Sequence, residues 1–152
     1  MGTLELPARV SLGFRRDDRL SFTGIGETRT VAQDESTIAI RDLLEELYAE
    51  ATPCGDSCRI AKPSLGNHFR IRWVTQGGPM LRFYLSTVNR VRPKFEVPGD
   101  ERTARLRSMV EQAFALARTD KQRIEDAAAA EKDVVDDYVA KLLAGEIVES
   151  AS

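Results

Sequence analysis

Eight of the 22 lysines and arginines of this chain lie in one segment, between Ser57 and Phe95. This segment contains no aspartate or glutamate, although the formal net charge of the whole chain is only −2. Arginine presents a planar fork of donors that matches a phosphate group, and an aromatic ring beside it offers a surface on which a base can stack. The segment is therefore suited to binding a phosphate-bearing ligand. Its basic residues are Arg59, Lys62, Arg70, Arg72, Arg82, Arg90, Arg92 and Lys94.

Alternation of apolar and polar residues predicts that this segment forms a β-hairpin over residues 69–74 and 81–85. In both strands the apolar side chains fall on one face and the basic side chains on the other. The pattern therefore predicts a sheet with one face in the core and the other in solvent. If the second strand runs on to Val91, two further arginines have the same parity. The predicted ligand-binding residues are Arg70, Arg72, Arg82, Tyr84, Arg90 and Arg92.

The two strands of this hairpin must agree in which face is apolar, and this limits the turn between them. A three-residue turn at Gly77–Pro79 sets Trp73 opposite Phe83 and Arg72 opposite Tyr84. A two-residue turn would set the tryptophan opposite an arginine and bury a charge. We therefore predict the three-residue turn.

The remainder of the first hundred residues predicts an earlier hairpin, a further short strand and one helix. Apolar residues recur at helical spacing over residues 36–51, and either Asp34 or Ser36 can serve as the N-cap of this helix. A Thr52-Pro53 pair ends it. The predicted strands lie at residues 10–14, 20–23 and 28–31.

The last fifty residues predict helices. After Asp100, an apolar stripe at i, i+3, i+4 spacing indicates an amphipathic helix. Thr119 and Gln122 have the spacing of a capping box, which predicts a kink or a new helix there. The stripe of this second helix is thin, so we expect the helix to pack on a small-residue seam or to associate with another chain. The stripe consists of Ile124, Ala128, Val135, Tyr138, Leu142 and Leu143.

These elements predict an α+β fold in which antiparallel β-hairpins pack on one helix and a C-terminal arm of one or two helices follows. The balance of charge also differs between the part of the chain before residue 100 and the part after it. Residues 1–99 contain 14 lysines and arginines against 12 aspartates and glutamates, and residues 100–152 contain 8 against 12. We assign residues 1–99 to a core domain. Residues 100–149 form the helical arm, either within the same domain or as a dimerisation element.

Three residues have side chains that bind metals, but their pattern is not that of a zinc site. Cys54 and Cys58 have C-x3-C spacing rather than C-x2-C, and His68 leaves no obvious fourth ligand. Because His68 is the single histidine, catalysis by a conventional general base has little support. The sequence therefore predicts no catalytic residue, no cofactor and no metal. It does not decide whether these three residues bind a metal ion.

The sequence also indicates a location. No apolar run approaches the roughly 18 residues that span a bilayer, and the first residues lack the pattern of a secretory signal. We therefore expect a cytoplasmic protein with no membrane contact and with both cysteines reduced.

The leading functional hypothesis is a non-enzymatic binding protein that recognises nucleic acid, a nucleotide or another phosphate-bearing ligand through its basic sheet face. In a purely structural alternative, the arginines simply occupy solvent-exposed strand positions, or acidic residues of the C-terminal helices lie over these arginines and neutralise them. A second functional hypothesis is an adaptor or inhibitor, of the kind a small mobile-element protein provides. Such a protein would act through its acidic C-terminal helices on a protein partner, or as a homodimer.

Overall fold

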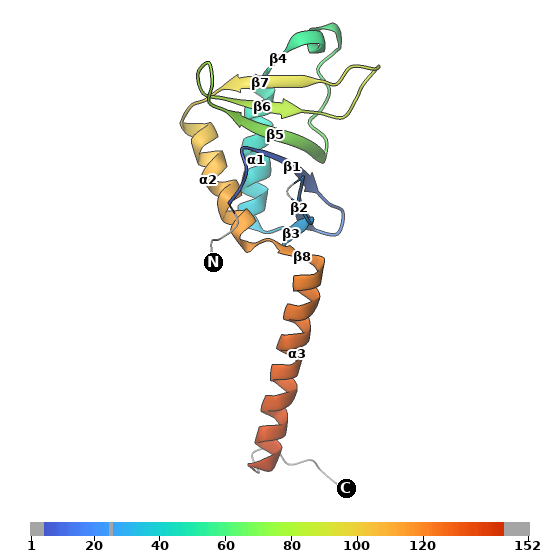
Figure 1. Ribbon diagram of the computed structural model, residues 1–152, viewed down its shortest axis with the longest axis vertical. Helices are drawn as coiled ribbons and strands as arrows, with labels where there is room; N and C mark the ends of the chain where they lie inside the picture. The colour runs from blue at the N-terminus through green and yellow to red at the C-terminus, as the bar shows by residue number, and fades with distance from the viewer. Residues whose placement is uncertain (1–4, 25, 145–152) are drawn as a thin grey trace. The chain divides into compact units, whose positions relative to one another are not determined.

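The protein has a mixed α+β fold, as the alternation of its residues predicts (Figure 1). The computed structural model describes residues 5–24 and 26–144. The chain divides into two compact units, one ending at Ala117 and the other beginning at Arg118. The elements of the first unit are β1 (Arg9–Phe14), β2 (Arg19–Thr23), β3 (Arg29–Ala32), α1 (Glu35–Glu50), β4 (Thr52–Pro53), the 3-10 helix η1 (Gly55–Arg59), β5 (His68–Val74), β6 (Met80–Tyr84), β7 (Lys94–Pro98) and α2 (Glu101–Leu116).

The strands of the first unit form one antiparallel sheet in the order β4-β7-β6-β5-β1-β2-β3. Both predicted hairpins are present, as β1 with β2 and β5 with β6. The predicted short strand is present as β3. β1 also pairs with β5, and this pairing joins the two hairpins into one sheet. The sequence analysis did not predict β7, which pairs with both β6 and β4.

The predicted register of the second hairpin is wrong by two residues. Trp73 lies opposite Leu81, and Phe83 lies opposite Ile71. The pair of the β5–β6 ladder nearest the turn is Val74 with Met80. Residues 75–79 therefore form the turn, which is two residues longer than predicted. A shift of two residues leaves every side chain on its predicted face.

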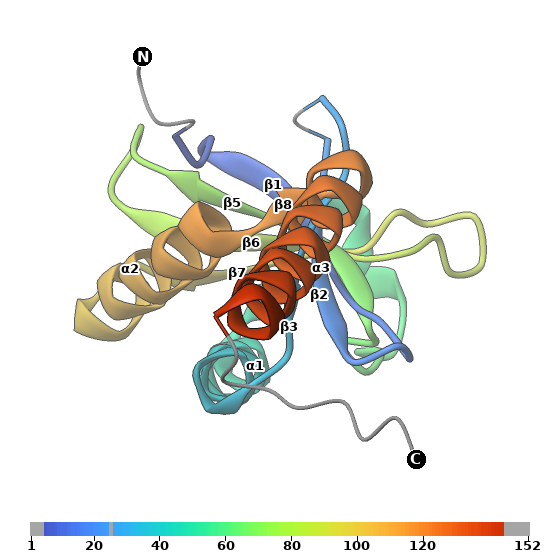
Figure 2. The same cartoon turned by 90° about the horizontal axis from the view of Figure 1, so that it is seen from below.

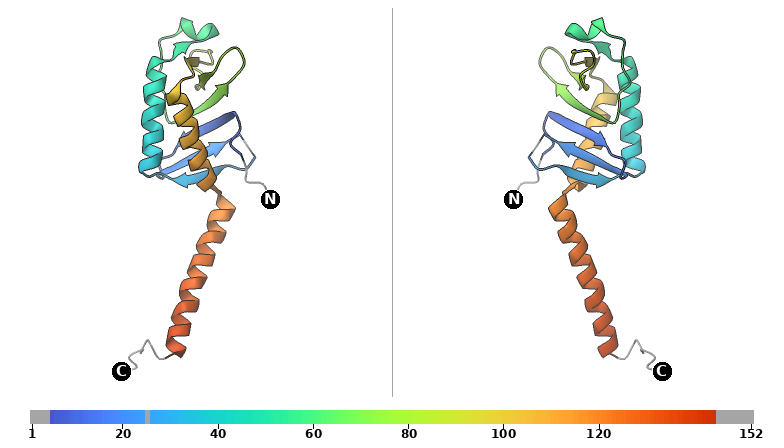
Figure 3. Two further views of the ribbon diagram at one scale, coloured as in Figure 1. Left: turned by 90° about the vertical axis from the view of Figure 1, so that its left-hand side faces the viewer. Right: turned by 90° about the vertical axis from the view of Figure 1, so that its right-hand side faces the viewer.

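Helices α1 and α2 cover one face of this sheet. Asp34 is the N-cap of α1 and accepts hydrogen bonds from the backbone N–H groups of Ser36 and Thr37. Asp100 caps α2 in the same way. In Figures 2 and 3 both helices lie on the same side of the strands. The fully buried side chains between helices and sheet include Leu12, Leu20, Phe22, Ile40, Leu44, Leu47, Phe69, Ile71, Leu81, Phe83, Phe95, Leu106 and Val110.

The helix α2, which is the first part of the predicted arm over residues 100–149, belongs to the first unit, and this is compatible with the predicted alternative that the arm lies within the same domain. Its apolar stripe is buried, and Phe114 makes an edge-to-face contact with Phe22 of β2, with ring centroids 5.3 Å apart. α2 also contacts α1 and β3. The compact unit therefore continues past the predicted boundary to Ala117.

The second unit contains β8 (Arg118–Thr119) and α3 (Asp120–Leu143). The predicted capping box is confirmed: the Thr119 side chain accepts from the N–H of Gln122, and the Gln122 side chain accepts from the N–H of Thr119. No residue of α3 is buried. The predicted end of the arm, residues 145–149, lies outside the described residues. Among the described helices, none has the length and apolar character to cross a bilayer.

Candidate functional site

The sheet face opposite α1 and α2, here called the open face, carries polar side chains in two rows that cross adjacent strands. One row consists of Ser11, Arg70, Tyr84 and Lys94 on β1, β5, β6 and β7. The other consists of Arg9, Arg72, Arg82 and Glu96 on the same four strands. The structure therefore brings four of the six predicted ligand-binding residues together on one face.

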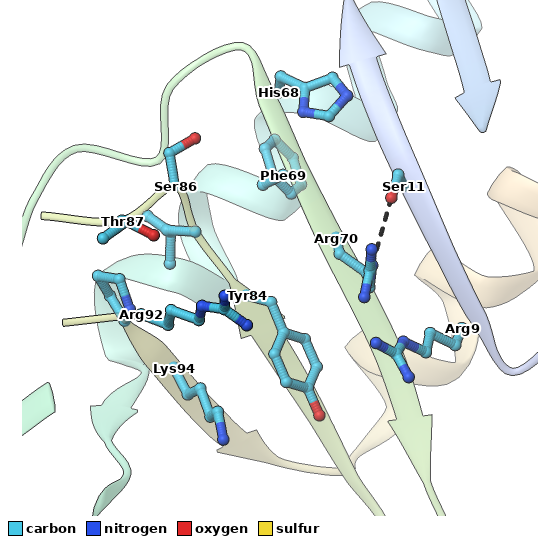
Figure 4. Close-up of a pocket in the computed structure, with 12 residues that line it drawn as sticks. Arg9, Ser11, His68, Phe69, Arg70, Tyr84, Ser86, Thr87, Arg92 and Lys94 are labelled. Atoms are coloured by element: carbon cyan, nitrogen blue, oxygen red, sulfur yellow. Dashed lines mark hydrogen bonds between the residues drawn. The ribbon is translucent and has the colours of Figure 1, made fainter. Parts of the chain in front are cut away.

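The open face contains a basic pocket with a volume of about 520 Å³. Four segments of the chain contribute to it, and among the described residues that line it there is no aspartate or glutamate. Figure 4 shows Arg9, Arg70 and Arg92 around the ring of Tyr84. The lining residues are Arg9, Ser11, His68, Phe69, Arg70, Tyr84, Leu85, Ser86, Thr87, Arg92, Pro93 and Lys94.

The side chains of the basic pocket have few partners that would compete with a ligand. Nε of Arg70 donates a long hydrogen bond of 3.4 Å to the Ser11 hydroxyl. The guanidinium carbon of Arg9 lies 5.8 Å from the centre of the Tyr84 ring, within the range of a cation–π interaction. Both arginines therefore keep donors available for an acceptor in the pocket.

Arg82 differs from these arginines because it is bound to other side chains. Its Nε and Nη2 donate to Oε2 of Glu96 at 3.2 and 3.1 Å, and its Nη1 donates to the Tyr84 hydroxyl at 3.4 Å. Burial raises the pKa of Tyr84, but hydrogen bonds from Arg82 and Arg72 outweigh burial and lower this pKa below its usual value. Neither Arg72 nor Arg82 lines the basic pocket. They support it by holding the Tyr84 phenol.

Three arginines lie side by side on adjacent strands of the open face. Arg9 is opposite Arg72, and Arg72 is opposite Arg82. Like charges that face each other directly across strands destabilise a sheet. Glu96 pairs with Arg82 at one end of the row. An anion bound on this face would reduce the repulsion that remains at the other end.

The second strand of the hairpin does not run on to Val91, because β6 ends at Tyr84. The chain instead reverses at Asn89 and Arg90, which have φ angles of 48° and 65°. Val88 and Val91 flank this reversal and exchange two backbone hydrogen bonds of 2.8 Å. Two central residues with positive φ are typical of a type I′ turn. Arg90 is therefore at a loop tip and does not line the basic pocket.

The loop that follows this turn brings Arg92 to the basic pocket by a different route from the predicted strand extension. The sequence analysis did not include Arg9, Ser11, Ser86, Thr87 or Lys94 in the site. Arg9 and Ser11 share the polar face of β1, and this pattern is visible in the sequence. Their place beside Arg70 depends on the pairing of β1 with β5, which local patterns do not predict.

Lys62 belongs to the basic segment but has a structural role. Its Nζ donates to the carbonyl oxygens of Tyr48, Ala49 and Ala51 at the C-terminal end of α1, and it lies 4.6 Å from the Tyr48 ring centre. A cation is favourable at this end of a helix dipole. Burial lowers the pKa of Lys62. Its charge thus stabilises α1 and is not available to a ligand.

The three residues with metal-binding side chains do not come together. Among the described residues, no group of three or more His, Cys, Asp and Glu side chains is arranged to hold a metal ion. His68 lines the basic pocket, whereas Cys54 is the N-cap of η1 and Cys58 lies within η1, both as free thiols. Burial, together with a hydrogen bond to Glu96, raises the pKa of Cys54 to about 11. This thiol is therefore not activated as a nucleophile.

No model of a known protein family, no curated protein and no solved structure matches this chain. The chemistry of the site is therefore the basis for its function. Arginine and lysine donors, three hydroxyl-bearing side chains and a tyrosine ring surround a pocket whose described lining includes no carboxylate. This arrangement can neutralise an anion and stack against a planar group.

Proposed function

We propose that this protein binds a phosphate-bearing ligand, either nucleic acid or a nucleotide, in the basic pocket of its open face. The observation that carries the proposal is the lining of that pocket, which holds Arg9, Arg70, Arg92 and Lys94 with no carboxylate among the described lining residues. Exposed charges on a protein surface are normally interspersed in sign. Four cations around one concavity create a positive potential that favours a polyanion.

Two further features support a nucleotide or nucleic acid over a simple inorganic anion. Tyr84 projects into the pocket between arginines and offers a ring on which a base can stack (Figure 4). Ser86 and Thr87 provide hydroxyl groups at the pocket margin, and such groups commonly contact phosphate and sugar oxygens.

Binding to a fluorescein-labelled oligothymidylate of about twelve nucleotides, followed by fluorescence anisotropy, tests this proposal. The affinity should fall linearly with salt on a double-logarithmic plot, because phosphate contacts release condensed counterions. If each of the four pocket cations contacts one phosphate, the slope should be about −3, at about −0.7 per phosphate. Absence of binding at low salt, or binding that does not change with salt, would contradict the proposal.

We also propose a second function, in which α3 mediates self-association with a second copy of the chain. The supporting observation is that α3 exposes apolar side chains along its length although none of its residues is buried. The exposed fraction of the side chain is 70% for Ile124, 71% for Val134 and 53% for Val135. Apolar side chains at this density on a helix normally face a partner, and closed two-fold pairing is the commonest assembly.

Light scattering of the full chain tests self-association. We expect a mass near twice 16.9 kDa, and we expect the double variant Val135→Asp and Val139→Asp to be monomeric. A charge placed in an apolar helix interface loses its hydration without gaining a partner, and this disfavours the dimer. Asp136→Asn on the acidic surface of α3 is the control and should keep the mass of the full chain. A full chain with the monomer mass would exclude self-association.

A further inference from the structure

The basic pocket continues into two adjoining hollows. His68 lines the basic pocket and also a hollow of about 480 Å³ that reaches Arg15 and Arg16 after β1. A third hollow of about 330 Å³ shares Phe14 and both of these arginines, and extends to Arg41 on α1. The basic pocket and the second hollow adjoin at His68, and the second and third hollows share Phe14, Arg15 and Arg16, so the three hollows follow one another along the surface. We call them together the long groove.

Gly13 and His68 both line the second hollow, where it adjoins the basic pocket. A Cβ atom at Gly13 would lie 2.5 Å from the Ser21 hydroxyl oxygen and 3.3 Å from Cδ2 of His68. Any side chain at this position would therefore displace its neighbours. Glycine leaves the passage between the basic pocket and the second hollow open.

The charge of the long groove remains positive beyond the basic pocket. Asp17 is the one carboxylate among its described lining residues, and it is paired with Arg15 at 2.7 Å. Arg16 is exposed, and among the described residues no ion pair involves it. Arg9 and Arg15 are six residues apart on one extended segment, a span of about 20 Å at about 3.3 Å per residue. A single phosphate group cannot contact cations that far apart.

Each end of the long groove has an aromatic ring. Tyr84 lies in the basic pocket, and Phe14 lines both of the other hollows. The Phe14 ring already has two neighbours, the Phe69 ring with centroids 6.3 Å apart and the Arg41 guanidinium at 5.0 Å from its centre, and Arg41 is ion-paired with Glu45. The stacking surface is therefore the Tyr84 ring, and an aromatic ring in a positively charged groove is an arrangement by which single-stranded nucleic acids are bound.

From the adjoining hollows of the long groove, from their positive charge and from the Tyr84 ring we infer that the ligand is a single strand of nucleic acid several nucleotides long. This inference rests on the proposed function and specifies its ligand. The strand extends from Tyr84 past His68 to Arg16, with phosphates on the basic side chains and a base on the Tyr84 ring. The groove passes from the open face, around the end of β1, to the helix α1 on the opposite face. A duplex, whose persistence length is about 150 base pairs, cannot follow such a turn.

The experiment compares oligothymidylates of about four and about twelve nucleotides in the same anisotropy assay. We expect the longer strand to bind at least about tenfold more tightly, because only the longer strand reaches both ends of the groove. Arg16→Ala should weaken the longer strand by roughly threefold to tenfold and reduce its salt slope by about 0.7, while the shorter strand is unaffected. Arg105→Ala, an exposed arginine on α2 outside the groove, removes the same charge and should change neither affinity.

Equal affinities for the two lengths, together with an Arg16→Ala variant that binds like the unmodified protein, would overturn the inference. The proposed function would then still stand on the basic pocket. Tighter binding to a duplex of the same length would also overturn it. If neither length binds at low salt, the proposed function itself fails, and the two results are therefore distinguishable.

Discussion

Replacing Arg70 and Arg92 together with alanine is expected to weaken oligothymidylate binding by about a hundredfold while leaving the protein folded. Both side chains line the basic pocket. A hydrogen bond to a charged group contributes about 1.5–3 kcal/mol, so each lost contact corresponds to about tenfold or more in affinity. Because Arg92 is exposed and Arg70 has only a long bond to Ser11, the free energy of unfolding should change by less than about 1 kcal/mol. Anisotropy titration and urea unfolding measure the two effects.

A matched control separates the local contacts from the general effect of charge. Arg59 and Arg105 are exposed and lie outside the basic pocket, so their double alanine variant has the same net charge as the pocket variant. We expect its affinity to remain within about threefold of the unmodified protein. Equal losses in the two variants would show that only net charge matters. A large loss of stability in the pocket variant would show that its arginines serve the fold.

Trp73→Ala is expected to lower the free energy of unfolding by roughly 3 to 5 kcal/mol, which is a large part of the about 5–15 kcal/mol that stabilises a typical domain. Trp73 is only 7% exposed on the core face of β5, and the Arg107 guanidinium lies 5.5 Å from its ring centre. Its removal leaves a cavity that the surrounding strands and α2 cannot fill. Because Trp73 is the single tryptophan, unfolding of the variant must be followed by circular dichroism.

A second substitution at the same position distinguishes packing from hydrogen bonding. Nε1 of Trp73 is buried and has no hydrogen-bond partner within the described part of the chain. A buried donor of this kind costs about 1–3 kcal/mol, so Trp73→Phe removes that cost and retains most of the apolar contact. We expect Trp73→Phe to lose less than about 1.5 kcal/mol. A red-shifted native emission that iodide quenches readily would contradict the burial of Trp73.

The features that are determined by residues close together in the sequence could be predicted. Asp34, Asp100 and Thr119 each start a helix as expected, because a cap is defined by a side chain and the N–H groups two or three residues later. The faces of the strands were also predictable. The period-2 alternation in β5 and β6 directly separates core side chains from those on the open face.

The register between β5 and β6 could not be predicted from the same pattern. A shift of two residues preserves alternation, so pairing Trp73 with Phe83 or with Leu81 buries the same side chains. The choice depends on the turn. Gly77 and Gly78 both adopt positive φ angles, of 77° and 99°, within a five-residue loop that the alternation does not specify.

The candidate site was only partly predictable because its residues meet through pairings between distant parts of the chain. Arg70 and Tyr84 belong to one hairpin, and their shared face follows from local alternation. Arg9 joins them because β1 pairs with β5 as well as with β2, its partner in the first hairpin. Arg92 reaches the pocket from an irregular loop, whose course has no periodic signal in the sequence.

The pairing of β1 with β5 also determines when the two halves of the sheet can join during synthesis. Ser11 and Arg70, which face each other in the sheet, are 59 residues apart in the chain. At about 5–20 residues per second, a ribosome exposes β1 several seconds before its partner strand emerges. During that interval the nascent hairpin of β1 and β2 has an unpaired edge, on which other chains can add a strand. The basic pocket is therefore completed only when the two hairpins join.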